Sequence, residues 1–114
     1  MNSRDKGARG EREWAEILRA HFPGRVFRRN IQSRGGGAEA ADVTGLPGWH
    51  AEVKRVEKLN IWAALQQAEG DAKPGERPYV AFRRNRGGWY VALPAPVFLE
   101  MLAVRGKGAM DDAA

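Results

Sequence analysis

Cysteine is absent from the 114 residues of this chain. Its absence excludes disulfide bonds, zinc sites built from thiolates and catalysis by a cysteine nucleophile. It also excludes a zinc deaminase, although His50 and Glu52 have the His-x-Glu spacing of that class, because such enzymes need cysteine ligands as well. A chain without cysteine is consistent with a cytoplasmic protein, and that is the compartment we expect.

Long hydrophobic runs are also missing. The apolar stretches are a few residues long, far below the roughly 20 residues needed to span a bilayer. The first residues contain no apolar core of a signal peptide, so we expect neither a membrane segment nor export. A chain of this length fits one domain, which we expect over residues 1–104, with residues 105–114 as a small, polar and disordered tail.

Positive charge is in excess, because 19 Lys and Arg residues outnumber 14 Asp and Glu residues and give a formal net charge of +5. Clustered cations gain affinity for phosphates by displacing counterions, so a polyanionic partner is favoured over a face that is merely solvated. The arginines gather in two segments, one over residues 25–34 and one over residues 77–86. Within them we expect DNA phosphate contacts from Arg28, Arg29, Arg34, Arg83, Arg84 and Arg86.

The spacing of apolar residues predicts alternating helices and strands. Trp14, Leu18 and Phe22 recur at helical spacing and Pro23 ends that segment, while Asn60 has the side chain of a helix N-cap. Short alternating runs between turn residues indicate strands. The predicted order is a helix over 8–22, strands over 25–31, 41–44 and 49–56 with a glycine-rich loop over 33–40, a helix from 60 to about 72, a hairpin of strands over 78–82 and 89–93, and a helix over 96–103.

Asp42 and the tripeptide Glu52-Val53-Lys54 lie on two neighbouring predicted strands. Residues two apart share a strand face, so Lys54 lies beside Glu52, with His50 on the same face. Two carboxylates and the Val53 carbonyl suit a hard divalent cation such as Mg²⁺, which polarises a phosphodiester and acidifies a bound water. The alternative is that Asp42 only begins a turn, while Glu52 and Lys54 form a solvated ion pair.

Glu11 weighs against that alternative. On a helical wheel it falls inside the apolar stripe that contains Trp14 and Leu18, whereas Glu13 and Glu16 fall toward the edge of the stripe or outside it. A charged side chain that faces the core needs a partner or a metal ion. We therefore place Glu11 in the candidate metal site.

Four short motifs follow one another along the chain: Lys6-Gly7-Ala8-Arg9-Gly10-Glu11-Arg12, then Asp42, then Glu52-Val53-Lys54, then Gln67-Ala68-Glu69. In this order they resemble the archaeal-type Holliday junction resolvases and their phage relatives, which belong to the PD-(D/E)xK nuclease superfamily. The resemblance spans residue 6 to about residue 102. It implies an α/β fold with a restriction-endonuclease-like αβββαβ core, in which helices flank a mixed central sheet.

The resemblance also implies a division of roles. Glu11, Asp42 and Glu52 match the family's metal-binding acids, Lys54 its catalytic lysine and Gln67 its accessory glutamine. The implied cofactor is Mg²⁺ or Mn²⁺, and the implied substrate is branched DNA. A homodimer is implied as well, and it is expected on physical grounds because symmetric cutting of two strands calls for two active sites.

The sequence departs from the resolvase pattern in two places. Ala41 stands where the motif usually has proline, and residues 33–40 do not closely match the resolvases' active-site loop. The second departure bears on junction specificity, and two alternative functions stay open. One is a repair, nicking or restriction-like nuclease of the same superfamily that acts on duplex DNA. The other is a DNA-binding module that keeps the fold without the chemistry, although a complete set of four site residues argues against it.

Overall fold

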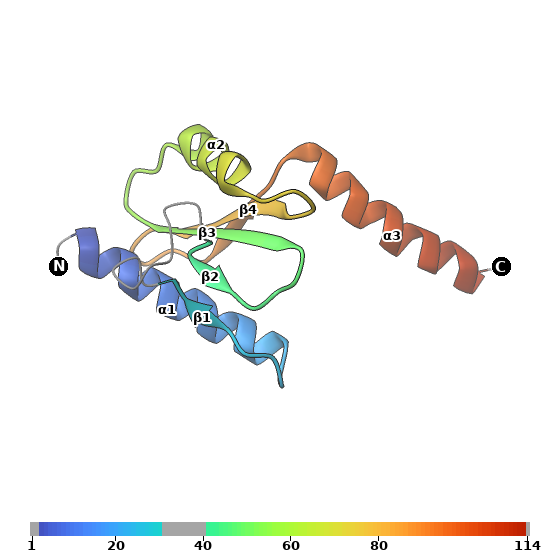
Figure 1. Ribbon diagram of the computed structural model, residues 1–114, viewed down its shortest axis with the longest axis horizontal. Coiled ribbons are helices and arrows are strands. Elements are labelled where there is room, and N and C mark those ends of the chain that lie inside the picture. The colour runs from blue at the N-terminus through green and yellow to red at the C-terminus, as the bar shows by residue number, and fades with distance from the viewer. Residues whose placement is uncertain (1–2, 31–40, 114) are drawn as a thin grey trace.

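The computed structural model describes the backbone of residues 3–30 and 41–113, and the side chains of residues 6–30 and 41–105. Within these residues a mixed sheet has helices on both faces (Figure 1). Its strands follow the order β1-β2-β3-β4-β5, with β3 and β4 parallel and the other neighbours antiparallel. The elements are α1 (Ser3–His21), β1 (Arg28–Arg29), β2 (Val43–Thr44), β3 (Trp49–Arg55), α2 (Ile61–Asp71), β4 (Arg77–Arg83), β5 (Tyr90–Ala92) and α3 (Ala95–Ala113).

The two faces of β3 differ in character, as its alternating sequence predicts. Ala51 and Val53 are buried in the core formed with α1, where Trp14 donates a 3.0 Å hydrogen bond from Nε1 to the Tyr79 hydroxyl. The opposite face is covered by α2, whose small residue Ala68 is fully buried in a second, smaller apolar cluster. The polar residues of β3 therefore lie beneath α2.

Gly10 allows α1 to pack closely on β3. A Cβ atom at this position would lie 2.9 Å from Cβ of Arg55, closer than real Cβ contacts. The glycine of the first sequence motif thus has a packing role, and it sets the depth at which the following Glu11 is held against the sheet.

The ends of α2 agree with the sequence. Asn60 precedes the helix and its side-chain oxygen accepts a 3.1 Å hydrogen bond from the Ala63 amide, which confirms the predicted N-cap. The helix ends at Asp71, one residue before the predicted end.

The first predicted strand, over residues 25–31, is shortened to Arg28–Arg29. Its partner β2 contains only two residues, because Gly45 adopts a φ of +137° and turns the chain away. A Cβ atom at Gly45 would lie 2.5 Å from the carbonyl oxygen of Val26, so only glycine fits this turn. Just after β1 the Asn30 amide donates a 2.9 Å hydrogen bond to the Asp42 carbonyl, and Ile31, the last residue of the predicted strand, lies outside the described residues.

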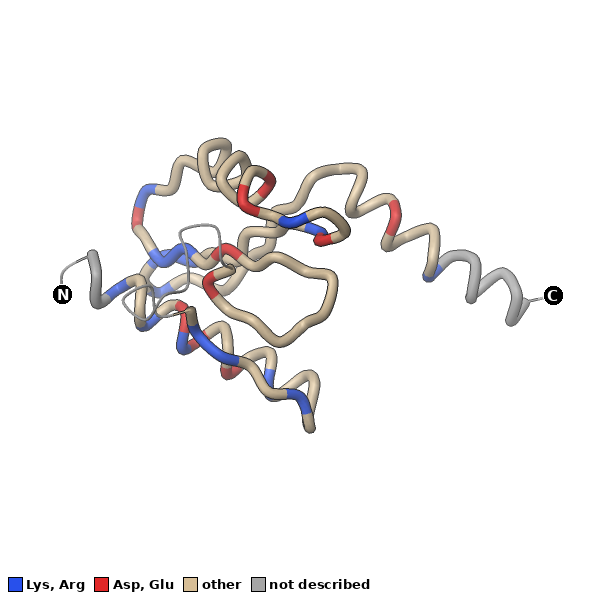
Figure 2. The backbone as a smooth tube through the Cα atoms, viewed as in Figure 1, with Lys and Arg blue, Asp and Glu red and all other residues tan. Residues whose placement is uncertain are grey.

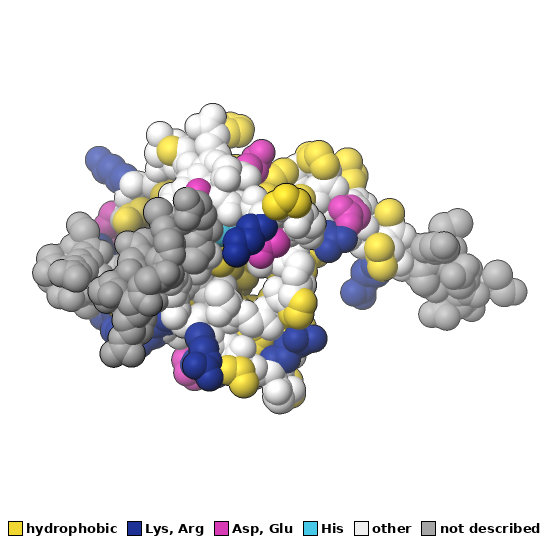
Figure 3. Space-filling view, in the orientation of Figure 1, with side chains coloured by type: hydrophobic (Ala, Val, Ile, Leu, Met, Phe, Trp, Pro, Cys, Tyr) yellow, Lys and Arg dark blue, Asp and Glu magenta, His cyan; other side chains and the backbone are white. Residues whose placement is uncertain are grey.

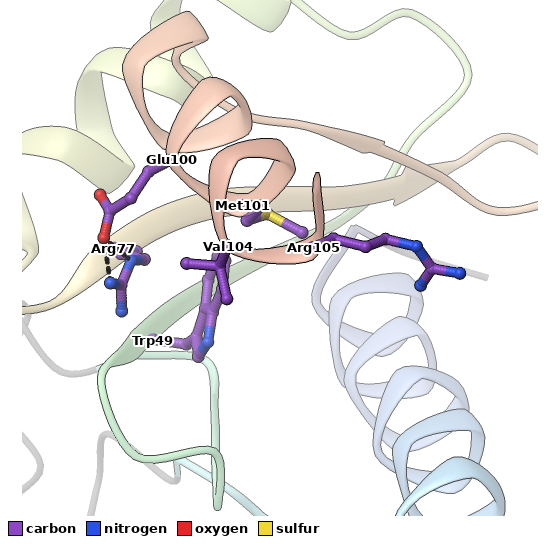
Figure 4. Close-up of a pocket in the computed structure, with 6 residues that line it drawn as sticks. All are labelled: Trp49, Arg77, Glu100, Met101, Val104 and Arg105. Atoms are coloured by element: carbon purple, nitrogen blue, oxygen red, sulfur yellow. Dashed lines mark hydrogen bonds and ion pairs between the residues drawn. The ribbon is translucent and has the colours of Figure 1, made fainter. Parts of the chain in front are cut away.

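The last helix is longer than predicted. It runs from Ala95 to Ala113, into the segment for which the sequence predicted disorder, because no proline follows Pro96 and most residues there tolerate a helix. Figure 1 shows α3 extending away from the sheet. Near its middle, Glu100 accepts a 2.9 Å hydrogen bond from Nε of Arg77, and both residues line a pocket of about 370 Å³ beside Trp49 (Figure 4).

Apolar side chains are exposed along α3, as Figure 3 shows for the face in view. Phe98, Leu99, Leu102 and Val104 are each about half or more exposed to solvent. Despite these residues, none of the helices in the described part of the chain combines the length and hydropathy that crossing a bilayer requires.

Candidate metal centre

Asp42 is fixed in place by the backbone of the neighbouring strand. Its amide donates a 2.8 Å hydrogen bond to the Ala51 carbonyl, and its side-chain Oδ2 accepts a 2.8 Å hydrogen bond from the Val53 amide. These two bonds come from residues on either side of Glu52. The pairing of β2 with β3 thus brings the two carboxylates of the predicted site together.

Glu52 is almost fully buried, with 1% of its surface exposed. Burial, the negative charge of Asp42 and a hydrogen bond to Asp42 together raise the pKa of Glu52 to about 8, against the opposing charge of Lys54. Two carboxylates this close favour holding a proton between them when no cation is near. The pair therefore has the chemistry of a divalent cation site, because a cation replaces that proton.

Lys54 reaches the same centre from the adjacent position on the strand face. Its Nζ donates a 3.1 Å hydrogen bond to Oε1 of Gln67, which lies on α2. The positive charge of Lys54 lowers the pKa of both Glu52 and Glu11. The lysine is thus directed by α2 toward the acids, and the structure brings together the two residues that the sequence assigned as catalytic lysine and accessory glutamine.

Glu11 is half-buried at the edge of this centre, as its helical phase predicts. Its Oε1 accepts hydrogen bonds from Nε and Nη2 of Arg29, at 3.3 and 3.1 Å. Burial and the nearby charge of Asp42 raise the pKa of Glu11, while Arg29 and Lys54 lower it. In this structure Glu11 forms an ion pair with Arg29. The charge of Asp42 affects the pKa of Glu11 without a hydrogen bond between the two side chains.

A different set of residues converges most tightly. Among the residues with described side chains, His50, Glu52 and Asp71 form a group whose potential ligand atoms all lie within 4.8 Å of one another. Sequence reasoning placed His50 on the face of Glu52 but gave it no role, and it did not select Asp71. The spacing of four residues between Gln67 and Asp71, one helical turn, is the sequence feature that could have identified the latter.

The helical wheel predicts that Glu13 does not point inward, but the structure places it in ion pairs with two arginines. It is half-buried, its Oε2 lies 2.8 Å from a guanidinium nitrogen of Arg83, and its Oε1 lies 3.4 Å from Nε of buried Arg55. A helical wheel shows only the direction in which a residue points from its own helix. Arg55 and Arg83 are the last residues of β3 and β4, so the wheel could not predict these ion pairs. Glu16 is exposed, in agreement with the prediction.

The predicted phosphate-binding arginines fall into three groups. Arg29 and Arg83 are held in ion pairs with acids of α1, while Arg28, Arg84 and Arg86 are exposed. Arg34 lies outside the described residues. A basic pocket of about 360 Å³ adds three cations that the sequence reasoning missed, Lys6, Arg9 and Arg55, and it is lined by these residues together with Asn85 and Arg86. Figure 2 shows Lys and Arg positions gathered around the N-terminal half of α1.

Comparison with known proteins agrees with this arrangement. Residues 2–108 match the family described as "Phage putative PDDEXK endonuclease". The structure resembles that of Hjc, a Holliday junction resolvase from the archaeal hyperthermophile Archaeoglobus fulgidus, with a TM-score of 0.55 and 24% sequence identity over 77% of this chain and 72% of that chain. The likeness confirms the predicted α/β, restriction-endonuclease-like fold. None of the curated proteins matches significantly. The chain belongs to the phage PDDEXK endonuclease family.

Proposed function

We propose that this endonuclease hydrolyses DNA phosphodiesters with a divalent cation and prefers branched DNA such as a Holliday junction. One observation carries the proposal: pairing of β2 with β3 places the Asp42 and Glu52 carboxylates in contact, with Lys54 directed toward them. Family membership supports nuclease chemistry.

The residues present fit a cation. The proximity of Asp42 raises the pKa of Glu52, so a cation bound between the two carboxylates would relieve their repulsion, and the Val53 carbonyl is the proposed third ligand. Mg²⁺ or Mn²⁺ bound there supplies positive charge to the phosphodiester and lowers the pKa of a bound water. The backbone hydrogen bond from Val53 holds the Asp42 carboxylate in position for this role.

Lys54 contributes the second part of the proposed chemistry. Its ammonium group lies close enough to the acids to influence both Glu11 and Glu52, so it can neutralise charge that develops on the attacked phosphate. Gln67 orients that ammonium group by accepting its hydrogen bond. Glu11 completes the proposed set. When substrate binds, its carboxylate can release Arg29 and bind a water or the cation instead.

The basic surface supports recognition of DNA by phosphate geometry. Arg28, Arg84 and Arg86 are exposed, and the basic pocket that includes Lys6 and Arg9 offers further cations beside the site. The likeness to a resolvase supports branched DNA as the preferred form. A homodimer is proposed as well, and the exposed apolar residues of α3, among them Leu99 and Leu102, are the candidates for its contact.

The test is cleavage of a four-way junction, a flap and a linear duplex, each with and without Mg²⁺. We expect magnesium-dependent cleavage that is fastest on the junction. Asp42→Asn and Glu52→Gln should abolish cleavage and leave DNA binding nearly intact, because these acids hold the cation and not the phosphates. Cleavage at the wild-type rate by either variant would refute the site, and equal cleavage of duplex and junction would refute the preference for branched DNA.

A further inference from the structure

His50, Glu52 and Asp71 form a second group of ligand atoms on the α2 side of the Asp42 and Glu52 pair. His50 and Glu52 are each 1% exposed, and Nε2 of His50 lies 2.9 Å from Oε1 of Glu52. Asp71 is half-buried at the last position of α2, with its ligand atom inside the same 4.8 Å group. One imidazole and two carboxylates at this spacing can surround a single ion.

The carboxylates of this group have no side-chain cation in contact with them. Among the residues with described side chains, neither Glu52 nor Asp71 has a Lys or Arg nitrogen within 4.0 Å. Lys54 donates its hydrogen bond to Gln67. Asp71 also stands at the C-terminal end of a helix, where the partial negative charge of the helix dipole disfavours a carboxylate. A cation bound in the group would compensate for both features.

The other nitrogen of His50, Nδ1, also faces a carboxylate. Nδ1 lies 3.7 Å from Oε1 of Glu76, and this carboxylate is itself fixed by a 2.8 Å hydrogen bond from the Lys73 amide. Each ring nitrogen therefore faces a carboxylate, and the contact of Nε2 with Glu52 is the shorter one. A cation bound between His50 and Glu52 would take the place of the proton in that contact, and Glu76 would then stand beside the nitrogen that does not bind the cation.

We propose that His50, Glu52 and Asp71 bind a second divalent cation, of the transition-metal class represented by Mn²⁺, and that Glu52 is shared between this site and the Asp42 site. An imidazole ligand favours Mn²⁺ or Zn²⁺ over Mg²⁺, which prefers oxygen ligands and retains its water. The inference deepens the proposed function, since it rests on Asp42 and Glu52 holding the first cation. It assigns His50 and Asp71 as metal ligands in this chain.

The experiment counts bound Mn²⁺, added alone, by isothermal titration calorimetry and by the loss of the free-ion electron paramagnetic resonance signal. The wild-type protein should bind two ions. Asp71→Asn and His50→Gln should each bind one, with at least a tenfold loss of affinity for the other. Glu69→Gln, an exposed acid on the same helix, is the matched control and should still bind two. A single ion in the wild-type protein, or two unchanged ions in Asp71→Asn, would overturn the proposal.

Folding and activity are measured alongside. His50 is buried, so His50→Gln is checked by circular dichroism, while Asp71→Asn lies at a helix end and keeps the test decisive if the histidine variant does not fold. Wild-type protein that cleaves DNA but binds one Mn²⁺ refutes the second site and leaves the proposed function standing. Protein that binds two Mn²⁺ and cleaves no DNA refutes the function and supports the site.

Discussion

The Val53 amide donates a 2.8 Å hydrogen bond to Oδ2 of Asp42, although eleven positions separate the two residues in the chain. This bond connects the residue before β2 to the centre of β3. Because Glu52 precedes Val53, the bond determines how close the two carboxylates can be. The candidate centre is therefore built on strand pairing, which is more rigid than a loop.

Lys54 and Gln67 should differ in their effect on catalysis. Lys54→Ala is expected to lower the single-turnover cleavage rate by about a hundredfold or more, the scale of a lost preorganised electrostatic group. Gln67→Ala should cause a smaller loss, because it releases the lysine without removing its charge. Rapid-quench kinetics at saturating Mg²⁺ measures both. Unfolding of Lys54→Ala would instead identify the lysine as a structural ion-pair partner.

The three glutamates of α1 should separate into three behaviours. Glu11→Gln should impair cleavage while the protein stays folded. Glu16→Gln should change neither activity nor stability, because this residue is exposed. Glu13→Gln should lower the free energy of unfolding by roughly 2 kcal/mol, because buried Arg55 loses its nearest carboxylate. Urea denaturation and cleavage assays are compared, and equal effects at all three positions would contradict the structure.

The stability of the metal-free protein should fall as pH rises. The pKa of Glu52 is raised from 4.5 to about 8 in the folded state. The folded protein therefore keeps a proton that the unfolded chain releases at a lower pH. The resulting stabilisation is complete below pH 4.5 and is lost as pH rises through 8. Urea midpoints measured in chelator between pH 5 and 8 should show this decline.

Glu52→Gln is the control for that experiment, because glutamine does not titrate. It should flatten most of the decline, although the smaller contribution of Glu11, whose pKa is also raised, should remain. An identical slope in the wild-type protein and in Glu52→Gln would show that another group controls the pH dependence.

DNA affinity should depend steeply on salt. If about six phosphates are neutralised, affinity should fall on the order of a thousandfold between 50 and 200 mM salt. Replacing Arg84 and Arg86 by Ala should flatten this dependence more than replacing Arg83, because Arg83 is already paired with Glu13. Competition of a four-way junction against duplex, in Ca²⁺ to prevent cutting, measures both effects. Equal affinity for the two DNAs would argue for a general duplex nuclease.

The exposed apolar face of α3 should control assembly. Leu99→Glu combined with Leu102→Glu should convert the proposed dimer to a monomer in sedimentation velocity, since it places charges in an apolar contact. Val26→Glu, which changes another exposed apolar residue, should leave the dimer intact. A wild-type monomer, or a dimer that survives both α3 substitutions, would contradict this placement of the interface.

The sequence by itself determined the order of the elements and the residues of the candidate site. Asn60, the alternation along β3 and the spacing of Glu52 and Lys54 depend on local backbone geometry, so period and propensity were enough to predict them. The helical phase of Glu11 was predictable for the same reason. These features involve residues that are close in the chain or belong to one element.

Only the tertiary structure decided which distant groups meet. The pairing of Glu13 with Arg55 and Arg83 depends on where β3 and β4 end above α1. The meeting of His50 with Asp71 depends on how far α2 runs before it stops over β3. Helix length and strand register set such contacts across elements, and neither a helical wheel nor a motif contains that information. Packing, not local pattern, therefore placed His50 and Asp71 beside the candidate site of Asp42 and Glu52.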